Sequence, residues 1–177
     1  ENGLPEDEIK KLIGTYAKLT SDKNATINAL CIYEGDDSYR FTDEFPFSSE
    51  RKMSMIEAVR GEEKFVFIIG GYDILINSLD EKSKTDYEKI FSENNLSIYR
   101  NILFGKVKTS GSINDIKDSP DKIEIEPYCI ISIKDSIRED VFDAIKLFND
   151  NGIKIKILSG DSSKSVQEVA NEIGWKI

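Results

Sequence analysis

The sequence predicts an α/β protein in two parts. The first part is an α+β domain, in which a mainly antiparallel sheet is flanked by helices, and the second is a shorter parallel α/β segment. Two observations support this class. A pair of helical segments is followed by a run of strand-like segments, and from about residue 131 strand and helix patterns alternate. The boundary is expected near residues 127–134, which divides the chain into residues 1–130 and 131–177.

Two helices are expected at the beginning of the chain. Pro5 can open the first, because proline is favoured at the first helical position, and the second follows Ser21. Each helix has apolar residues on one face. These are Ile9, Leu12, Ile13 and Tyr16 in the first helix and Ile27, Leu30 and Cys31 in the second.

Alternating apolar and polar residues then predict a series of strands, interrupted by two short helices. The expected strands cover residues 39–45, 52–59, 64–69, 97–107 and 123–133, and the helices cover 72–79 and 83–94. The polar stretch 110–122 contains Gly111 and Pro120 and is expected to be a loop.

The most informative segment begins at Ile153, where isoleucine and lysine alternate as in a strand. The segment ends in Ser159-Gly160-Asp161, and a helical pattern covers residues 162–173. Free N–H groups at a strand-to-helix turn favour an anion such as phosphate. A simple helix cap explains the same residues equally well.

A second motif precedes this strand, because Asp135 and Arg138 open another helix that ends near Gly152. The order resembles the phosphorylation domain of P-type (E1-E2) cation-transporting ATPases, a parallel α/β domain similar to haloacid dehalogenases. That family has Asp-Pro-Pro-Arg, then Ala-Gly-Ile, then Thr-Gly-Asp. The resemblance implies supporting roles in phosphoryl transfer for a set of five residues: Asp135, Arg138, Ser159, Gly160 and Asp161.

The resemblance extends upstream to the segment from Phe47 to Met55, which is similar to the Phe-Ser-x-x-Arg-Lys-x-Met-Ser signature of the family's nucleotide-binding domain. It implies that Phe47 stacks on adenine and that Lys52 lies beside the nucleotide. Both roles suit the side chains, since an aromatic face binds a flat base and a lysine supplies a mobile charge. A hairpin with a core phenylalanine is the alternative.

Two further matches are partial. Gly70 falls where the family has the glycine of Lys-Gly-Ala-Pro-Glu, but Ile69 replaces the lysine, so Arg51 or Lys64 is a candidate to compensate. Asp73 replaces the glutamate of the same motif. Arg100 resembles the arginine that contacts the nucleotide phosphates in the family, whereas Ile27 stands where the family has an adenine-side glutamate and receives no polar role.

Two family motifs are absent from the sequence: Asp-Lys-Thr-Gly-Thr, which carries the phosphorylated aspartate, and the magnesium-binding Gly-Asp-Gly-x-Asn-Asp. The resemblance therefore implies a cytoplasmic ATP-binding part of a pump, which presents ATP to an aspartate elsewhere and so drives ion transport. The expected partners are ATP and the remaining phosphorylation, actuator and membrane domains, with Mg²⁺ bound only in the complete protein. Alone, this chain is expected to be inactive.

Composition limits the other possibilities. The net charge of −9 disfavours nucleic acid as a partner, and the absence of histidine disfavours zinc or His-based catalysis, so no metal site is expected. Two cysteines predict a reduced protein. We see no membrane-spanning run and no signal peptide, and expect a location on the cytoplasmic side of the membrane.

Two alternatives remain open. The first is a fragment of a haloacid-dehalogenase-like phosphatase, a class that has the strand-then-hydroxyl motif without an adenine-stacking domain. The second is a non-catalytic interaction domain that kept this fold and lost ATP binding. ATP binding without a second substrate would distinguish a pump fragment from both.

Overall fold

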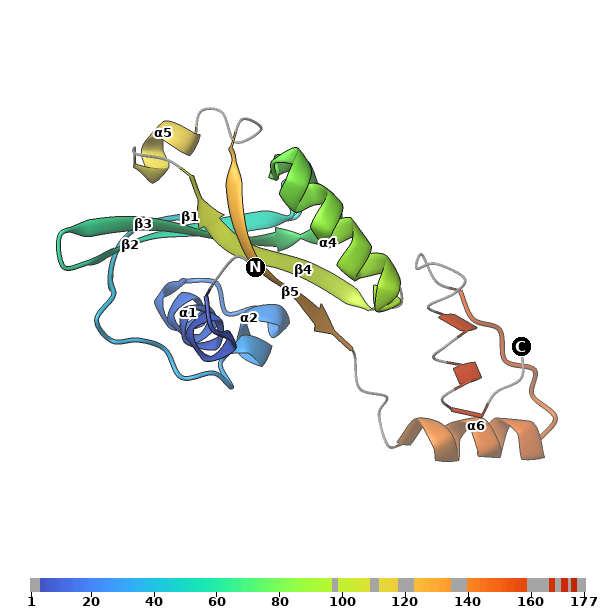
Figure 1. Ribbon diagram of the computed structural model, residues 1–177. Coiled ribbons are helices and arrows are strands. Elements are labelled where there is room, and N and C mark those ends of the chain that lie inside the picture. The colour runs from blue at the N-terminus through green and yellow to red at the C-terminus, as the bar shows by residue number, and fades with distance from the viewer. Residues whose placement is uncertain are drawn as a thin grey trace.

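Five strands follow one another in an antiparallel meander, and each pairs with the next (Figure 1). The strands are β1 (Arg40–Ser48), β2 (Met53–Arg60), β3 (Glu63–Gly71), β4 (Arg100–Val107) and β5 (Ile125–Ile133). The computed structural model describes residues 4–96, 99–108, 112–117, 123–134, 140–158, 166–167, 170–171 and 173–174. The predicted antiparallel sheet flanked by helices is confirmed.

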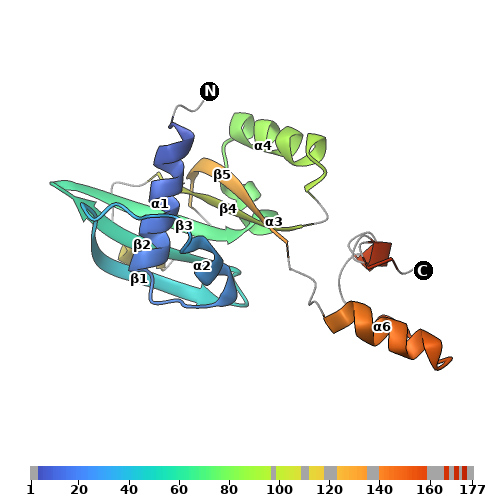
Figure 2. The ribbon, with the colours of Figure 1, turned by 90° about the horizontal axis from the view of Figure 1, so that it is seen from below.

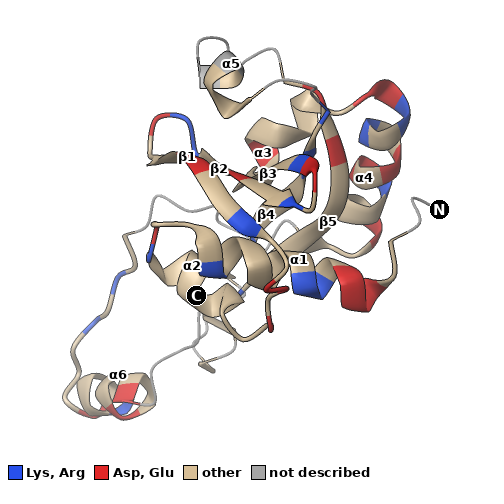
Figure 3. Cartoon of the chain, turned by 90° about the vertical axis from the view of Figure 1, so that its left-hand side faces the viewer, with Lys and Arg blue, Asp and Glu red and all other residues tan. Residues whose placement is uncertain are grey.

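Helices cover both faces of this sheet (Figures 1 and 2). On one face lie α1 (Glu6–Leu19) and α2 (Ala25–Leu30). On the other lie α3 (Tyr72–Leu75), the 3₁₀ helix η1 (Ile76–Ser78), α4 (Glu81–Glu93) and α5 (Ile113–Lys117). In α4 acidic and basic residues are interspersed, whereas in α1 the acidic residues stand in the first turn and the lysines follow, so both helices carry charges of both signs (Figure 3).

The apolar run in β3 shows how the sequence forms a sheet with two buried faces. Phe67 and Ile69 pack with α1 and α2, whereas Val66 and Ile68 pack with the residues of α3, η1 and α5. Successive side chains of a strand point to opposite faces, so a continuous apolar run supplies both cores. The same separation holds in β4, where Phe104 belongs to the first core and Leu103 to the second.

The helices α2 and α4 begin with side-chain caps. The side chain of Asn24 accepts a hydrogen bond from the backbone N–H of Ile27 at the start of α2. The side chain of Asp80 does the same for Ser83 at the start of α4. Each cap satisfies an N–H group that has no partner inside its helix. Pro5 is the N-cap residue of α1, so the helix begins at Glu6, one position after the predicted start.

Two predictions of secondary structure from the sequence are wrong. The polar stretch 110–122 contains α5, a short helix whose Ile113 and Ile116 are buried in the second core. Residues 153–158 form no strand, although isoleucine and lysine alternate there. A parallel strand needs a neighbouring strand for its hydrogen bonds, and no described residue pairs with this segment.

The helix α6 (Asp140–Asp150) forms where a helix was expected and has no buried residue. Strand β5 continues to Ile133, so residues 131–133 belong to the five-stranded sheet, and the division into residues 1–130 and 131–177 stays a prediction. No helix among the described residues is both long enough and apolar enough to cross a bilayer.

The two cysteines are free thiols in different surroundings. Cys31 is exposed at the end of α2, whereas Cys129 is partly buried in β5. Burial raises the pKa of the Cys129 thiol to about 12, because a thiolate is poorly solvated there.

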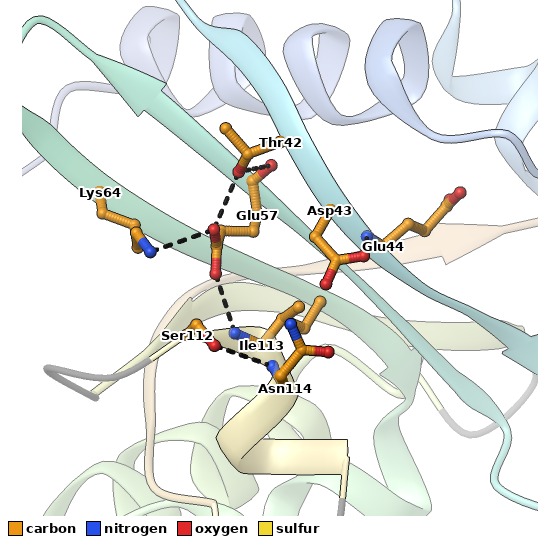
Figure 4. Close-up of polar contacts among 8 residues, drawn as sticks. All are labelled: Thr42, Asp43, Glu44, Glu57, Lys64, Ser112, Ile113 and Asn114. Carbon is orange, nitrogen blue, oxygen red and sulfur yellow. Dashed lines mark hydrogen bonds and ion pairs between the residues drawn. The ribbon is translucent and has the colours of Figure 1, made fainter.

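A buried carboxylate holds α5 against the sheet (Figure 4). Glu57 of β2 accepts a hydrogen bond from the backbone N–H of Ile113 at 2.8 Å and another from the Thr42 hydroxyl at 2.9 Å. Lys64 pairs with the same carboxylate at 3.3 Å. Because the Glu57 side chain is only 6% exposed, these three groups replace its water.

We expect Glu57→Ala to lower the free energy of unfolding by about 1–3 kcal/mol, because the N–H of Ile113 and the Thr42 hydroxyl would lose their buried acceptor. Urea unfolding followed by circular dichroism measures the change. Glu62→Ala, at an exposed position of the β2–β3 turn, is the matched control and should change stability little. Equal effects of the two substitutions would contradict this role of Glu57.

The same network predicts a pH dependence. Burial alone would raise the pKa of Glu57, but the hydrogen bonds from Ile113 and Thr42 and the Lys64 ion pair outweigh it and hold the pKa below its ordinary value. The stabilisation is therefore present above the carboxyl pKa of the unfolded chain and is lost as pH falls through the lower folded value. In the Glu57→Gln variant this component of the pH dependence should disappear.

Candidate functional site

A pocket of about 700 Å³ opens on the face of the sheet that carries α1 and α2. Four chain segments line it: the start of α2, the β1–β2 turn, the end of β3 with the residues after it, and the start of β4. Phe47, Lys52, Gly70 and Arg100, the four predicted nucleotide-binding residues, all lie in its lining. The volume is within the range of small-molecule sites.

Phe47 stands near the end of β1, and its backbone is held by a contact outside the sheet. The residue is 40% exposed, so its ring is accessible to a ligand. The strand register is irregular between Phe45 and Ser48, and the N–H of Phe47 donates instead to a carboxylate oxygen of Asp22 at 3.0 Å. Asp22 therefore fixes the backbone that carries the ring, a role that the sequence pattern did not reveal.

A second carboxylate, on β1, holds the α1–α2 loop that contains Asp22. Glu44 accepts hydrogen bonds from the Thr20 hydroxyl and from the N–H of Ser21. Together with the Asp22 contact, these bonds connect the α1–α2 loop to the strand that carries Phe47. The position of the ring thus depends on residues more than twenty positions earlier in the chain.

Lys52 ends the β1–β2 turn in a left-handed backbone conformation, with φ at 52°. Its N–H donates to the carbonyl of Ser48 at 2.8 Å, and its own carbonyl accepts from the N–H of Gly71 at 2.9 Å. Non-glycine residues adopt this conformation at a cost of about 1 kcal/mol. The turn directs the lysine to the pocket lining, where its ammonium pairs with Asp73 at 3.2 Å.

Gly70 of β3 pairs with Met53 of β2 at the pocket, with no room for a side chain. A Cβ atom at this position would stand 2.7 Å from the Cβ of Met53 and 2.9 Å from the carbonyl oxygen of Lys52. No side chain fits at these distances, so glycine is required by the packing itself. This packing explains the glycine without requiring a ligand.

Arg100 opens β4 and brings a second cation to the lining. Its neighbour Asn101 was missed by the sequence reasoning, although it also lines the pocket. The Asn101 amide donates to the carbonyls of Leu96 and Tyr99 at 2.6 and 2.9 Å and accepts from the Ser132 hydroxyl at 2.7 Å. Asn101 thus anchors the start of β4 and indirectly positions Arg100.

Arg51 and Lys64, the candidates to compensate for the missing lysine, contact residues outside the pocket. Ile69 and Ile27 line the pocket and are 5% and 2% exposed, so the two substituted positions are apolar walls. Arg51 lies over the ring of Phe45 at 4.3 Å, and Lys64 pairs with Glu57. Neither Arg51 nor Lys64 belongs to the lining.

The buried side of the pocket contains one hydroxyl pair. Ser54 is 2% exposed, lines the pocket and lies 2.8 Å from the hydroxyl oxygen of Tyr16, which is fully buried. Burial raises the pKa of the Tyr16 phenol, so that hydroxyl stays protonated. The sequence could have pointed to Ser54, because this serine occupies an inward position of a strand that is otherwise mostly apolar.

Five further residues were predicted from the motifs to support phosphoryl transfer. Asp135, Arg138, Ser159, Gly160 and Asp161 lie outside the described residues, and their roles stay predictions. Gly152, at the end of α6, has φ of 69° and ends the helix as expected.

Comparison with known proteins agrees with the class of protein that the motifs indicated. No protein-family model matches the chain. Three curated relatives nevertheless align with most of it, and all three are named as cation- or calcium-transporting ATPases. These similarities support a fragment of a P-type cation-transporting ATPase.

The individual relatives are bacterial proteins. The chain is 23% identical to the probable cation-transporting ATPase exp7 of Streptococcus pneumoniae over 96% of this chain. It is 26% identical over 98% of its length to the calcium-transporting ATPase CtpE of Mycolicibacterium smegmatis. It is 32% identical over 74% to the calcium-transporting ATPase 1 of Lactococcus lactis. The chain spans 20%, 22% and 16% of these relatives, respectively.

The left-handed turn at Lys52 makes a stability prediction. The free energy of unfolding of Lys52→Gly should be about 1 kcal/mol higher than that of Lys52→Ala, because glycine adopts this φ without strain whereas alanine does not. Chemical denaturation measures both variants. The control pair is Lys106→Gly and Lys106→Ala in β4, where glycine should be the less stable member. If the glycine variant were less stable than the alanine variant at position 52, as it is expected to be at position 106, the turn at Lys52 would not be strained.

Proposed function

We propose that this chain is the nucleotide-binding part of a P-type cation-transporting ATPase and that its pocket holds ATP. One observation carries the proposal. Phe47, Lys52, Gly70 and Arg100 come from three separate segments and were selected from sequence motifs alone, yet all four line one pocket. Chance placement on a sheet with two faces would scatter them.

The chemistry of the lining suits a nucleotide. Phe47 offers an exposed aromatic face, and Ile27, Ile69 and Ile102 supply apolar walls on which a base can pack. Lys52 and Arg100 supply positive charge for the phosphates within a chain of net charge −9. The pocket therefore combines the two kinds of contact that ATP requires.

In this proposal the chain binds ATP and presents it to an aspartate in another part of the pump. That part also supplies the Mg²⁺ ligands, and the membrane domain carries the ion. Asp135, Arg138, Ser159, Gly160 and Asp161 would assist once the domains close. We place the pocket on the cytoplasmic side of the membrane, where ATP is available.

The site should bind ATP weakly, with a dissociation constant in the high-micromolar to millimolar range, or about 4–6 kcal/mol. Apolar Ile69 and Ile27 replace the family's lysine and glutamate, and Asp73 competes with phosphate for Lys52. Phe47→Ala should weaken adenosine and ATP alike by about 1–3 kcal/mol. Lys52→Ala should weaken ATP more than adenosine, with a difference that shrinks as salt rises.

NMR titration of the isotope-labelled chain measures these affinities. Phe41→Ala is the control for Phe47→Ala, because Phe41 is similarly exposed, at 42%, and lies outside the pocket lining. Lys82→Ala on α4 is the corresponding control for Lys52→Ala. Absence of nucleotide-dependent shifts at about 10 mM ATP, a concentration above the expected range, would refute the proposed function.

We also expect this chain alone to release no phosphate from Mg²⁺–ATP above background. The sequence lacks the Asp-Lys-Thr-Gly-Thr acceptor and the Gly-Asp-Gly-x-Asn-Asp metal motif, and phosphoryl transfer needs acceptor and metal positioned together. Phosphate release and intact-mass spectrometry provide two readouts. Steady turnover, or a phosphoryl group on the chain, would instead favour an independent phosphatase-like enzyme.

A further inference from the structure

The side chains that line the pocket offer a base mainly apolar surface. Five apolar residues belong to the lining: Ala25, Ile27, Phe47, Ile69 and Ile102. Stacking and dispersion depend on the flat ring and its area, and every purine offers a similar ring. These walls therefore favour a purine over a smaller base but do not separate adenine from guanine.

The side-chain amide of Asn101 and the amide oxygen of Asn24 already take part in hydrogen bonds within the chain. Asn101 uses both ends of its amide in the three hydrogen bonds that anchor β4. The side-chain oxygen of Asn24 accepts from the N–H of Ile27 at 3.0 Å as the cap of α2. A bidentate Asn or Gln is the usual group that selects adenine, because it matches both a donor and an acceptor of that base. Asn101 therefore cannot make such a pair, and the oxygen that Asn24 would need for it is held by the helix cap.

Ser54 differs from both asparagines because its hydroxyl can either donate a hydrogen bond to a ligand or accept one from it. Its oxygen lies 2.8 Å from the Tyr16 hydroxyl, and either atom can be the donor. If Tyr16 donates, the Ser54 O–H is left to donate to a ligand. If Ser54 donates to Tyr16, a lone pair of the Ser54 oxygen is left to accept from a ligand.

This reversal corresponds to the difference between the two purines. Adenine carries an amino donor at the position where guanine carries a carbonyl acceptor. Building on the proposed function, we propose that the pocket accepts purine nucleotides as a class, and that Ser54, supported by Tyr16, contacts the base edge of ATP and GTP alike. A fixed amide or carboxylate at this place would instead reject one of them, because a buried polar group would be left unpaired.

The direct test compares ATP, GTP and CTP binding to the unmodified chain in the presence of EDTA, by NMR titration. We expect dissociation constants for ATP and GTP within about threefold of each other, because one reversible hydroxyl meets both bases. CTP should bind more weakly than either, since its ring is smaller. GTP binding more than about tenfold weaker than ATP, or about 1.4 kcal/mol, would overturn the inference and leave the proposed function intact. If none of the three binds, both are overturned.

A variant tests the role of the hydroxyl. Ser54→Ala should weaken ATP and GTP by the same factor, about 2–12-fold, the equivalent of one net hydrogen bond. The control is Ser83→Ala, which removes another buried hydroxyl, 8% exposed, from α4 outside this pocket and should leave both affinities unchanged. Unchanged binding in Ser54→Ala, or loss for only one of the purines, would contradict the assignment. If thermal melting shows that Ser54→Ala is unfolded, the ATP-to-GTP ratio of the unmodified chain decides.

Discussion

The burial of both faces of the central strands is the constraint on which the remaining structure depends. β2, β3 and β4 each send alternate side chains into two separate cores. Each face must therefore be covered by helices, and the short α2, α3 and α5 acquire their stability from this covering. Helices of 4–6 residues have almost no stability of their own, so packing against the sheet maintains them.

The pocket follows from the same arrangement. Ser54, Ile69 and Ile102 belong to the face covered by α1 and α2, and the start of α2 leaves their end of the sheet open. Phe47 and Lys52 stand on either side of the β1–β2 turn at that opening. The cavity is therefore a gap in the helical layer above a sheet, with cations at its margin and an apolar base.

Sequence patterns predicted the strands because alternation and apolar runs report directly which face of the sheet a residue occupies. The four pocket residues were found because they lie in compact motifs. Contacts between distant segments were not accessible in this way. Ile113 bonds to a carboxylate 56 positions away, so α5 resembled a loop, and the Asp22 contact with Phe47 has no local signature. Residues 153–158 illustrate the opposite error, since a strand pattern forms no strand without a partner.

The two free cysteines give the molecule an internal reporter of its own unfolding. A thiolate is the species that alkylating reagents attack, so the exposed Cys31 should be modified rapidly. Cys129 is protected in two ways, by its place in β5 and by a pKa that burial raises to about 12. Its modification should therefore be slower than that of Cys31 and should speed up when β5 separates from the sheet, so labelling at Cys129 reports the opening of the edge strand.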